Sequence, residues 1–143
     1  MCSLVTERSF PEPDADSRPF WDGVAAAVLR IQRCLQCRRH VFYPRALCPY
    51  CMGSLEWVDA VGTGTIHSYT VVHRAPAEEY RAEVPYAVVL VDLDEGVRMM
   101  SRLVDCDPSE VRIGAAVEVQ FRELGGGPRL HVFRLIRSKG AGE

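Results

Sequence analysis

The feature that most constrains this chain is a pair of cysteine motifs of identical spacing. Cys34 and Cys37 form one Cys-x2-Cys motif, and Cys48 and Cys51 form a second one after an interval of ten residues. A Cys-x2-Cys turn holds two thiolates at the separation that a tetrahedral Zn²⁺ ion needs, and two such turns supply four ligands. Because four thiolates leave no open coordination position, the motifs predict one structural zinc ion per chain. Iron in the same cage is an alternative that the sequence leaves open.

The interval between the two motifs predicts a small hairpin. Val41-Phe42-Tyr43 alternates like a strand, and Pro44 turns the chain. Together with the cysteines, this pattern predicts a zinc ribbon over residues 29–54. The two other cysteines stand apart, and we interpret Cys2 as a residue of an N-terminal arm and Cys106 as a buried thiol.

Length and composition are those of one globular domain, or of one domain with a small added module. The chain has 143 residues, of which 48% are hydrophobic and 25% are charged. It contains no uninterrupted run of about 18 apolar residues, and its acidic N-terminus lacks the basic-then-apolar order of a signal peptide. Paired cysteines of this spacing favour metal over disulfides in a reducing compartment. The sequence therefore predicts a cytoplasmic protein.

After the cysteine motifs the pattern becomes that of β-strands. Residues 55–61 and 64–74 are interpreted as one long strand with a bulge or bend at Gly62-Thr63-Gly64, because glycine tolerates the backbone angles of a bend. A short helical turn capped by Asp107 is expected before the last two strands. Five strands in this order are typical of an OB-fold barrel. The other four strands are expected at residues 86–93, 97–104, 116–124 and 129–136.

An amphipathic helix is expected before the ribbon, at about residues 17–27. Phe20, Val24 and Ala27 recur at helical spacing, and Pro19 lies in the first turn. Phe20 and Trp21 are candidates for contact with a partner protein, and packing within this chain is an equal alternative. The fold class is therefore mainly β, with four parts in order. These are an arm and helix (1–28), a zinc ribbon (29–54), a five-stranded OB-fold (55–137) and a disordered tail (138–143).

No combination of residues in the sequence predicts a catalytic site. His67 and His73 lie six residues apart on one expected strand, with Asp59 on the preceding stretch, so an acid/base pair is conceivable. Alternating polar residues on an antiparallel strand more often form its solvated face. His40 and His131 are isolated and receive the same interpretation.

Positive charge is concentrated in the expected ribbon. The stretch from residue 29 to residue 55 holds five arginines and no acid, whereas the remainder holds 12 basic and 19 acidic residues. Arg38, Arg39 and Arg45 could bind an anionic ligand, or they could offset the negative charge of a zinc ion held by four thiolates. A single-stranded nucleic acid is one possible anion for an OB-fold. The acidic remainder and a pI of about 6.1 argue against it.

Several segments together resemble the domain of unknown function family thirty-five. They are FWDG (20–23), QRCLQC (32–37), PRALCPYC (44–51), EWV (56–58), GTGTIHSYTVVHRAP (62–76), PYAVVLVDLDEGVRMMSRLVDCDPSEVRIG (85–114) and VEVQF (117–121). The resemblance covers about residues 18–136 and implies an N-terminal helix, a rubredoxin-like zinc ribbon and an OB-fold. Many members have glycine after the first cysteine motif, where this chain has Arg38, so the local turn is the one departure.

The resemblance also implies a function. Similar proteins are partners of thiolase-like enzymes, including thiolases and lipid-transfer-protein-type aldolases that shorten steroid side chains. The expectation is a non-catalytic accessory subunit that supports folding of its partner and helps to form the acyl-CoA channel. In this interpretation the helix and ribbon contact the partner, and residues 75–85 face the acyl-CoA. The candidate acyl-CoA-binding residues are Arg38, Arg39, Arg45 and Arg74. The alternative is a single-stranded nucleic-acid-binding module.

Overall fold

The computed structural model describes residues 10–137 and begins with one short helix, α1 (Arg18–Ala25). Asp14 and Ser17 stabilise its start through two reciprocal bonds: Ser17 N–H donates to Asp14 Oδ1 at 2.8 Å, and Asp14 N–H donates to Ser17 Oγ at 3.0 Å. Pro19 lies in the first turn, where its missing N–H costs nothing. The expected helix is present but shorter. No helix in residues 10–137 is long and apolar enough to cross a membrane.

A three-stranded antiparallel sheet follows the helix. It contains β1 (Arg30–Cys34), β2 (His40–Val41) and β3 (Leu55–Asp59), in the order β2-β1-β3. Strand β1 pairs with β3 along its whole length, from Arg30 opposite Asp59 to Cys34 opposite Leu55. The interpretation of residues 55–74 as one strand is therefore wrong, because its first part belongs to the ribbon sheet. The expected domain boundary at residue 54 also cuts into this sheet.

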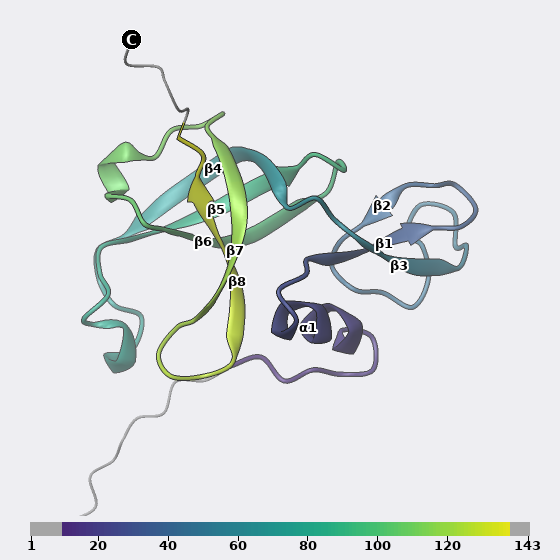
Figure 1. Ribbon diagram of the computed structural model, residues 1–143, viewed down its shortest axis with the longest axis horizontal. Coiled ribbons are helices and arrows are strands. Elements are labelled where there is room, and N and C mark those ends of the chain that lie inside the picture. Colours follow the sequence, from purple (N-terminus) through teal and green to yellow (C-terminus); the bar gives the residue numbers. More distant parts are fainter. Residues whose placement is uncertain (1–9, 138–143) are drawn as a thin grey trace, which may run out of the picture.

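Five strands then close into a barrel. They are β4 (Thr63–Val72), β5 (Tyr86–Leu93), β6 (Arg98–Val104), β7 (Ala116–Glu123) and β8 (Arg129–Leu135). Their order around the barrel is β4-β5-β6-β8-β7, with β6 and β8 parallel and the other pairs antiparallel. This order is that of an OB-fold, as the sequence predicts. Figure 1 shows the barrel on one side of the molecule, the ribbon on the other and α1 below their junction.

Two 3₁₀ turns lie between the strands, η1 (Glu78–Tyr80) after β4 and η2 (Pro108–Glu110) after β6. Asp107 caps η2 as expected: its carboxylate accepts a hydrogen bond from Ser109 N–H at 2.9 Å. Glu110 completes the capping box by accepting from Asp107 N–H at 3.3 Å.

The glycines after β3 have functions other than the expected bulge. Gly62 has a φ of +89°, which lets the chain turn from the ribbon sheet into the barrel. Gly64 packs against β5 so closely that a Cβ atom there would lie 2.3 Å from the carbonyl oxygen of Asp92. The register of β4 and β5 shifts further along, between Ile66 and Ser68, so the bulge contains His67.

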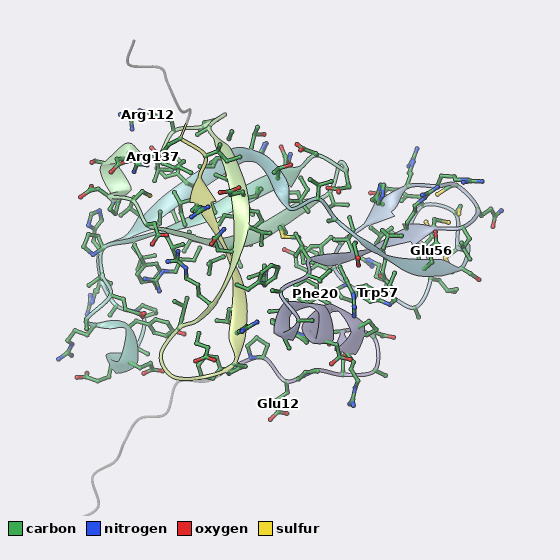
Figure 2. All side chains as sticks on the ribbon, in the orientation of Figure 1. Glu12, Phe20, Glu56, Trp57, Arg112 and Arg137 are labelled. Atoms are coloured by element: carbon green, nitrogen blue, oxygen red, sulfur yellow. The ribbon has the colours of Figure 1, made fainter. Side chains whose placement is uncertain are left out.

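One hydrophobic core spans the helix, the base of the ribbon and the barrel. Phe20 of α1 is 3% exposed and packs edge-on against Phe42 of the ribbon and His131 of β8, with ring centroids 5.6 and 5.1 Å apart. In Figure 2 it lies at the junction of the three parts. A second, smaller cluster surrounds Cys34 and Cys48 at the far end of the ribbon. The cysteine end of the ribbon therefore has little hydrophobic core of its own.

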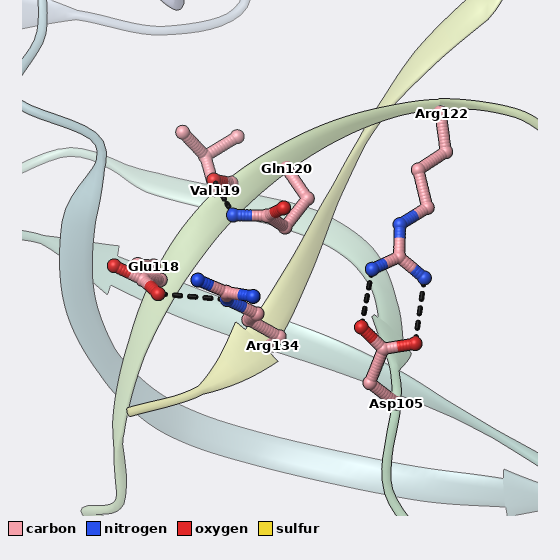
Figure 3. A network of polar contacts seen from close by, with 6 residues as sticks. All are labelled: Asp105, Glu118, Val119, Gln120, Arg122 and Arg134. Carbon is pink, nitrogen blue, oxygen red and sulfur yellow. Dashed lines mark hydrogen bonds and ion pairs between the residues drawn. The ribbon is translucent and has the colours of Figure 1, made fainter. Parts of the chain in front are cut away.

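Ion pairs connect neighbouring segments on the outer surface of the barrel (Figure 3). Arg134 Nε donates to Glu118 Oε1 at 2.7 Å across the β7–β8 pair, where the two residues stand opposite each other. Both terminal nitrogens of Arg122 donate hydrogen bonds to the carboxylate of Asp105, one of them at 2.6 Å. The Arg122 guanidinium lowers the pKa of Asp105. This pair connects β7 to the turn after β6.

Candidate metal centre

The four cysteines of the two motifs converge at the end of the ribbon. Cys34 Sγ lies 3.4 Å from Cys51 Sγ, and Cys37 Sγ lies 3.7 Å from Cys48 Sγ. All four sulfur atoms lie within 4.8 Å of one another. In residues 10–137 they form the only group of three or more potential metal ligands, whereas Cys2 lies outside the described residues.

The two cysteine motifs have nearly the same backbone structure. The first thiolate of each motif accepts a hydrogen bond from the amide two residues later, Gln36 N–H at 3.3 Å and Tyr50 N–H at 3.4 Å. Each motif also closes with a bond to the carbonyl of its first cysteine, from Arg38 N–H at 3.1 Å and from Met52 N–H at 2.9 Å. The sequence repeat is therefore a structural repeat.

The residue after each motif adopts a left-handed conformation. The φ angle is +67° at Arg38 and +63° at Met52. This region favours glycine, which many members of the family that the sequence resembles have after the first motif. Arg38 therefore keeps the turn that a glycine would make, and the departure noted in the sequence does not change the cysteine geometry.

The geometry fits a tetrahedral zinc ion. Zinc–sulfur bonds of about 2.3 Å in a tetrahedron place sulfur atoms about 3.8 Å apart, close to the two shortest separations here. Hydrogen bonds from the amides of Cys37 and Gln36 lower the pKa of Cys34, which favours the thiolate that metal binding requires. The neighbouring Cys34 sulfur raises the pKa of Cys51, so the two thiols share one proton in the absence of a metal. With four thiolates bound, such an ion has no position for water or substrate, so it would support folding rather than chemistry.

A buried glutamine holds the loop between the motifs. Gln32 of β1 is 4% exposed, and its amide makes two bonds with the backbone of Arg45: Arg45 N–H donates to Oε1 at 2.8 Å, and Nε2 donates to the Arg45 carbonyl at 2.9 Å. These two hydrogen bonds attach the backbone of the loop to β1, as a neighbouring strand would. Sequence reasoning did not find Gln32, because nothing in the strand RIQRC (30–34) distinguishes it from the polar residues around it.

The candidate acyl-CoA-binding arginines do not form one site. Arg38 and Arg39 follow the first cysteine motif, and the Arg39 guanidinium stacks on Tyr50 at 4.6 Å from the ring centroid. Arg45 lines a polar groove of about 420 Å³ between the ribbon and the β5–β6 hairpin. Arg74 follows β4, and that segment lies at the end of the barrel away from the ribbon (Figure 1). All four side chains are exposed.

The two aromatic partner candidates differ in burial. Phe20 is enclosed by the core of this chain, which is the packing alternative that the sequence left open. Trp21 is half-buried beside it, with its ring centroid 4.9 Å from that of Phe20.

The interpretation of His131 as a solvated residue is wrong. It is largely buried under α1, and burial lowers its pKa to about 4. Its strand position is polar, but the helix covers that end of β8.

The other histidine candidates form no acid/base site. His67 Nδ1 lies 3.4 Å from Asp92 Oδ2, on the neighbouring strand, and the same carboxylate binds Arg98 Nε at 2.6 Å. Asp59, the acid considered from the sequence, instead lies 3.7 Å from Arg30. His67 and His73 are exposed, as expected for a solvated face.

Comparison with known proteins identifies both parts of the chain. Residues 21–58 match the rubredoxin-like zinc ribbon domain of ChsH2, and residues 57–122 match the C-terminal OB-fold domain of ChsH2. Over 94 residues the chain is 44% identical to a DUF35 domain-containing scaffold protein of Methanothermobacter thermautotrophicus, covering 64% of this chain and 70% of that one. This chain belongs to the DUF35 family. The zinc ribbon and the converging cysteines together assign one structural zinc ion to it.

Two further relatives of this DUF35 chain are associated with CoA or aldolase chemistry. The 3-oxo-4,17-pregnadiene-20-carboxyl-CoA hydratase alpha subunit of Mycobacterium tuberculosis is 40% identical over 119 residues, which cover 77% of this chain but only 37% of the subunit. A solved structure described as an Ltp2-ChsH2(DUF35) aldolase matches with a TM-score of 0.79 and 33% identity, covering 88% of this chain and 98% of that one.

Proposed function

We propose that this protein is an accessory subunit of a thiolase-like acyl-CoA enzyme, either a thiolase or a lipid-transfer-protein-type aldolase. It supports the folding of its partner and contributes to the acyl-CoA channel. The observation that carries the proposal is the match to the aldolase structure, since this chain covers 98% of that chain. The M. tuberculosis relative, whose name includes a steroid acyl-CoA, supports a bulky substrate.

The chemistry of the described residues supports an accessory role. A zinc ion held by four thiolates cannot activate water or polarise a carbonyl group. His67 lies beside the Asp92 carboxylate, which also binds Arg98, so this carboxylate is part of an ion pair on the surface of the barrel. The acid, base or nucleophile of the reaction therefore belongs to the partner subunit.

The exposed end of the ribbon is the best candidate for partner contact. Leu35 is 56% exposed, Tyr50 is 60% exposed and Met52 is 69% exposed, all within or next to the cysteine motifs. Tyrosine, methionine and arginine, the last of these at Arg38 and Arg39 beside the first motif, are enriched in protein interfaces. We therefore expect this surface, rather than Phe20, to contact the partner, because the core of this chain already covers Phe20.

Reconstitution tests the proposal. The thiolase-like protein that co-purifies with this chain from its host should be less soluble and less active on acyl-CoA when this chain is absent. Leu35→Glu with Tyr50→Glu should abolish co-purification, whereas Ile113→Glu, at an equally exposed position of the barrel, should not. A partner that is fully soluble and active without this chain would contradict the proposal, as would turnover of an acyl-CoA by this chain alone.

A further inference from the structure

An aromatic cavity of about 410 Å³ lies on the outer surface of the barrel, where β6 meets β8. This volume is within the range of about 300–1,000 Å³ that is usual for pockets binding drug-sized ligands. It is much larger than an acetyl group needs. Its apolar wall comes from segments far apart in the sequence, namely Phe10, Trp21, Tyr80, Tyr86, Met100 and Leu130.

Polar side chains interrupt this apolar wall, among them Arg102 and His131. Arg102 lines the cavity, with its guanidinium 4.3 Å from the ring centroid of Tyr86 and 3.4 Å from Glu83 Oε1. Its Nε and the Nδ1 of His131 are buried without a hydrogen-bond partner among the described residues. Buried polar atoms are rarely left without a partner unless water or a ligand completes them. An oxygen atom on a bound ligand would serve these groups.

The cavity and the polar groove beside the ribbon both border β6. Arg98, Met100 and Arg102 alternate along β6, so all three lie on its outer face. Arg98 lines the groove together with Arg45 and His40, whereas Met100 and Arg102 line the cavity. Arg98 and Met100 are only about 7 Å apart along the strand. Met100 is 58% exposed, so the side of the cavity that is nearer the groove along β6 is accessible from solvent.

The groove and the cavity together fit a molecule with an anionic end and a bulky apolar end. The groove offers the Arg45 guanidinium beside the Asp92–Arg98 ion pair, and the cavity offers aromatic faces on which flat or fused rings can stack. We propose that the aromatic cavity binds a bulky, ring-containing acyl group that carries an oxygen substituent, with the thioester end lying along the outer face of β6 toward the groove. The proposal rests on the proposed function for the thioester, and it adds the class of acyl group and its site.

A solvent-sensitive probe tests the cavity on the isolated chain. Prodan (6-propionyl-2-dimethylaminonaphthalene) has two fused rings and a ketone, and its emission shifts to the blue in an apolar site. We expect saturable binding of prodan to the full-length, zinc-loaded protein. A non-fluorescent polycyclic ketone, androst-4-ene-3,17-dione, should displace it, and hexanoic acid should not. The parent amine without the ketone, 2-dimethylaminonaphthalene, should bind more weakly.

Matched variants locate the binding. Met100→Lys and Leu124→Lys each place a charge at the cavity and should raise the apparent Kd for prodan at least tenfold. Ile113→Lys, a similar change at a position 69% exposed and outside the cavity, should change it less than twofold. Unchanged zinc content and far-UV circular dichroism show that the variants fold. Absence of saturable binding, or equal effects of the three folded variants, would overturn the cavity assignment.

Kinetics of the reconstituted complex separate this inference from the proposed function. Met100→Lys should raise the KM for a polycyclic acyl-CoA severalfold and leave the KM for hexanoyl-CoA unchanged. If the partner needs this chain but Met100→Lys changes the KM for both substrates equally, or for neither, the cavity proposal is wrong and the accessory role stands. If the partner is fully active without this chain while prodan still binds, the accessory role is wrong and the cavity remains a ligand site.

Discussion

The backbone N–H of Val61 donates a 2.8 Å hydrogen bond to the carboxylate of Glu95. Val61 lies in the linker between the ribbon and the barrel, and Glu95 lies in the turn between β5 and β6. A second contact reinforces this connection, because Thr63 Oγ1 donates to the carboxylate of Asp94. The linker is therefore held against the barrel, and so is the ribbon that forms one wall of the polar groove.

Replacing Glu95 should loosen this connection. Glu95→Ala removes the acceptor for Val61 N–H and should lower the free energy of unfolding by about 1–2 kcal/mol. Glu95→Gln keeps an acceptor oxygen and should retain most of that stability. Urea denaturation of the three proteins measures the difference. Equal stability of Glu95→Ala and the natural protein would mean that the bond does not hold the linker.

Loss of one zinc ligand should unfold the end of the ribbon. Cys48→Ala should reduce the zinc content from about one equivalent per chain to nearly none, because the four-thiolate site supplies the folding free energy of a segment with little core. The barrel signals in an NMR spectrum should persist. Cys106→Ala, which removes a half-buried thiol outside the site, should keep the zinc. Well under one equivalent of zinc in unoxidised natural protein would contradict the assignment.

The left-handed residue after the first motif predicts a stabilising substitution. Arg38→Gly should raise the free energy of unfolding by roughly 0.5–1 kcal/mol, because a φ of +67° is strained for arginine and not for glycine. Arg39→Gly removes the same charge at the next position and should be destabilising, since it also loses the stacking on Tyr50. Thermal unfolding at saturating zinc compares them. A destabilised Arg38→Gly would show that the arginine side chain outweighs backbone strain.

Burial of His131 predicts a dependence of stability on pH. Its pKa in the folded protein is about 4, below the ordinary value of 6.5, because burial disfavours the charged ring. The unfolded chain therefore binds a proton that the folded protein does not, and the free energy of unfolding should fall as the pH drops from about 6.5 toward 4. His131→Phe should flatten this part of the profile. His73→Gln, at an exposed position, should leave the slope unchanged, and an unchanged slope in His131→Phe would refute the assignment.

The charge distribution predicts little affinity for nucleic acids. The acidic remainder of the chain, and the distance between the ribbon and the segment after β4 that holds Arg74, leave few cations to neutralise neighbouring phosphates. Weak binding to a single-stranded oligonucleotide at low salt should disappear near 0.15 M salt. Fluorescence anisotropy measures it, and sub-micromolar affinity at that salt concentration would favour the nucleic-acid-binding alternative.

The strands themselves could be predicted well from residue patterns. Tyr86–Leu93 has the expected bounds because β-branched residues fill it and the turn Asp94-Glu95-Gly96 ends it. The cysteine cluster was predictable for a similar reason, since two short motifs of fixed spacing define it. The partner of Leu55–Asp59 was not predictable, because alternation identifies a strand but does not say which strand lies beside it.

The aromatic cavity and the environment of His131 were also beyond the sequence. His131 has the spacing of a strand residue, and only the packing of α1 against β8 removes it from water. The cavity draws its walls from the arm, the helix, η1 and three strands. No local pattern records such a meeting of distant segments, because it depends on the closed barrel and on the position of the helix.

The shared interior has a practical consequence for anyone who wishes to dissect this protein. The two family models meet at residues 57 and 58, and both positions lie within β3. Cutting the chain there would remove part of β3 from β1, with which it pairs along its whole length, and would expose Ile31, which is 0% exposed in the intact chain. The ribbon and the barrel have separate names, but neither can be expressed alone as an intact unit. A fragment that carries only one of them would have an incomplete sheet and a newly exposed apolar surface.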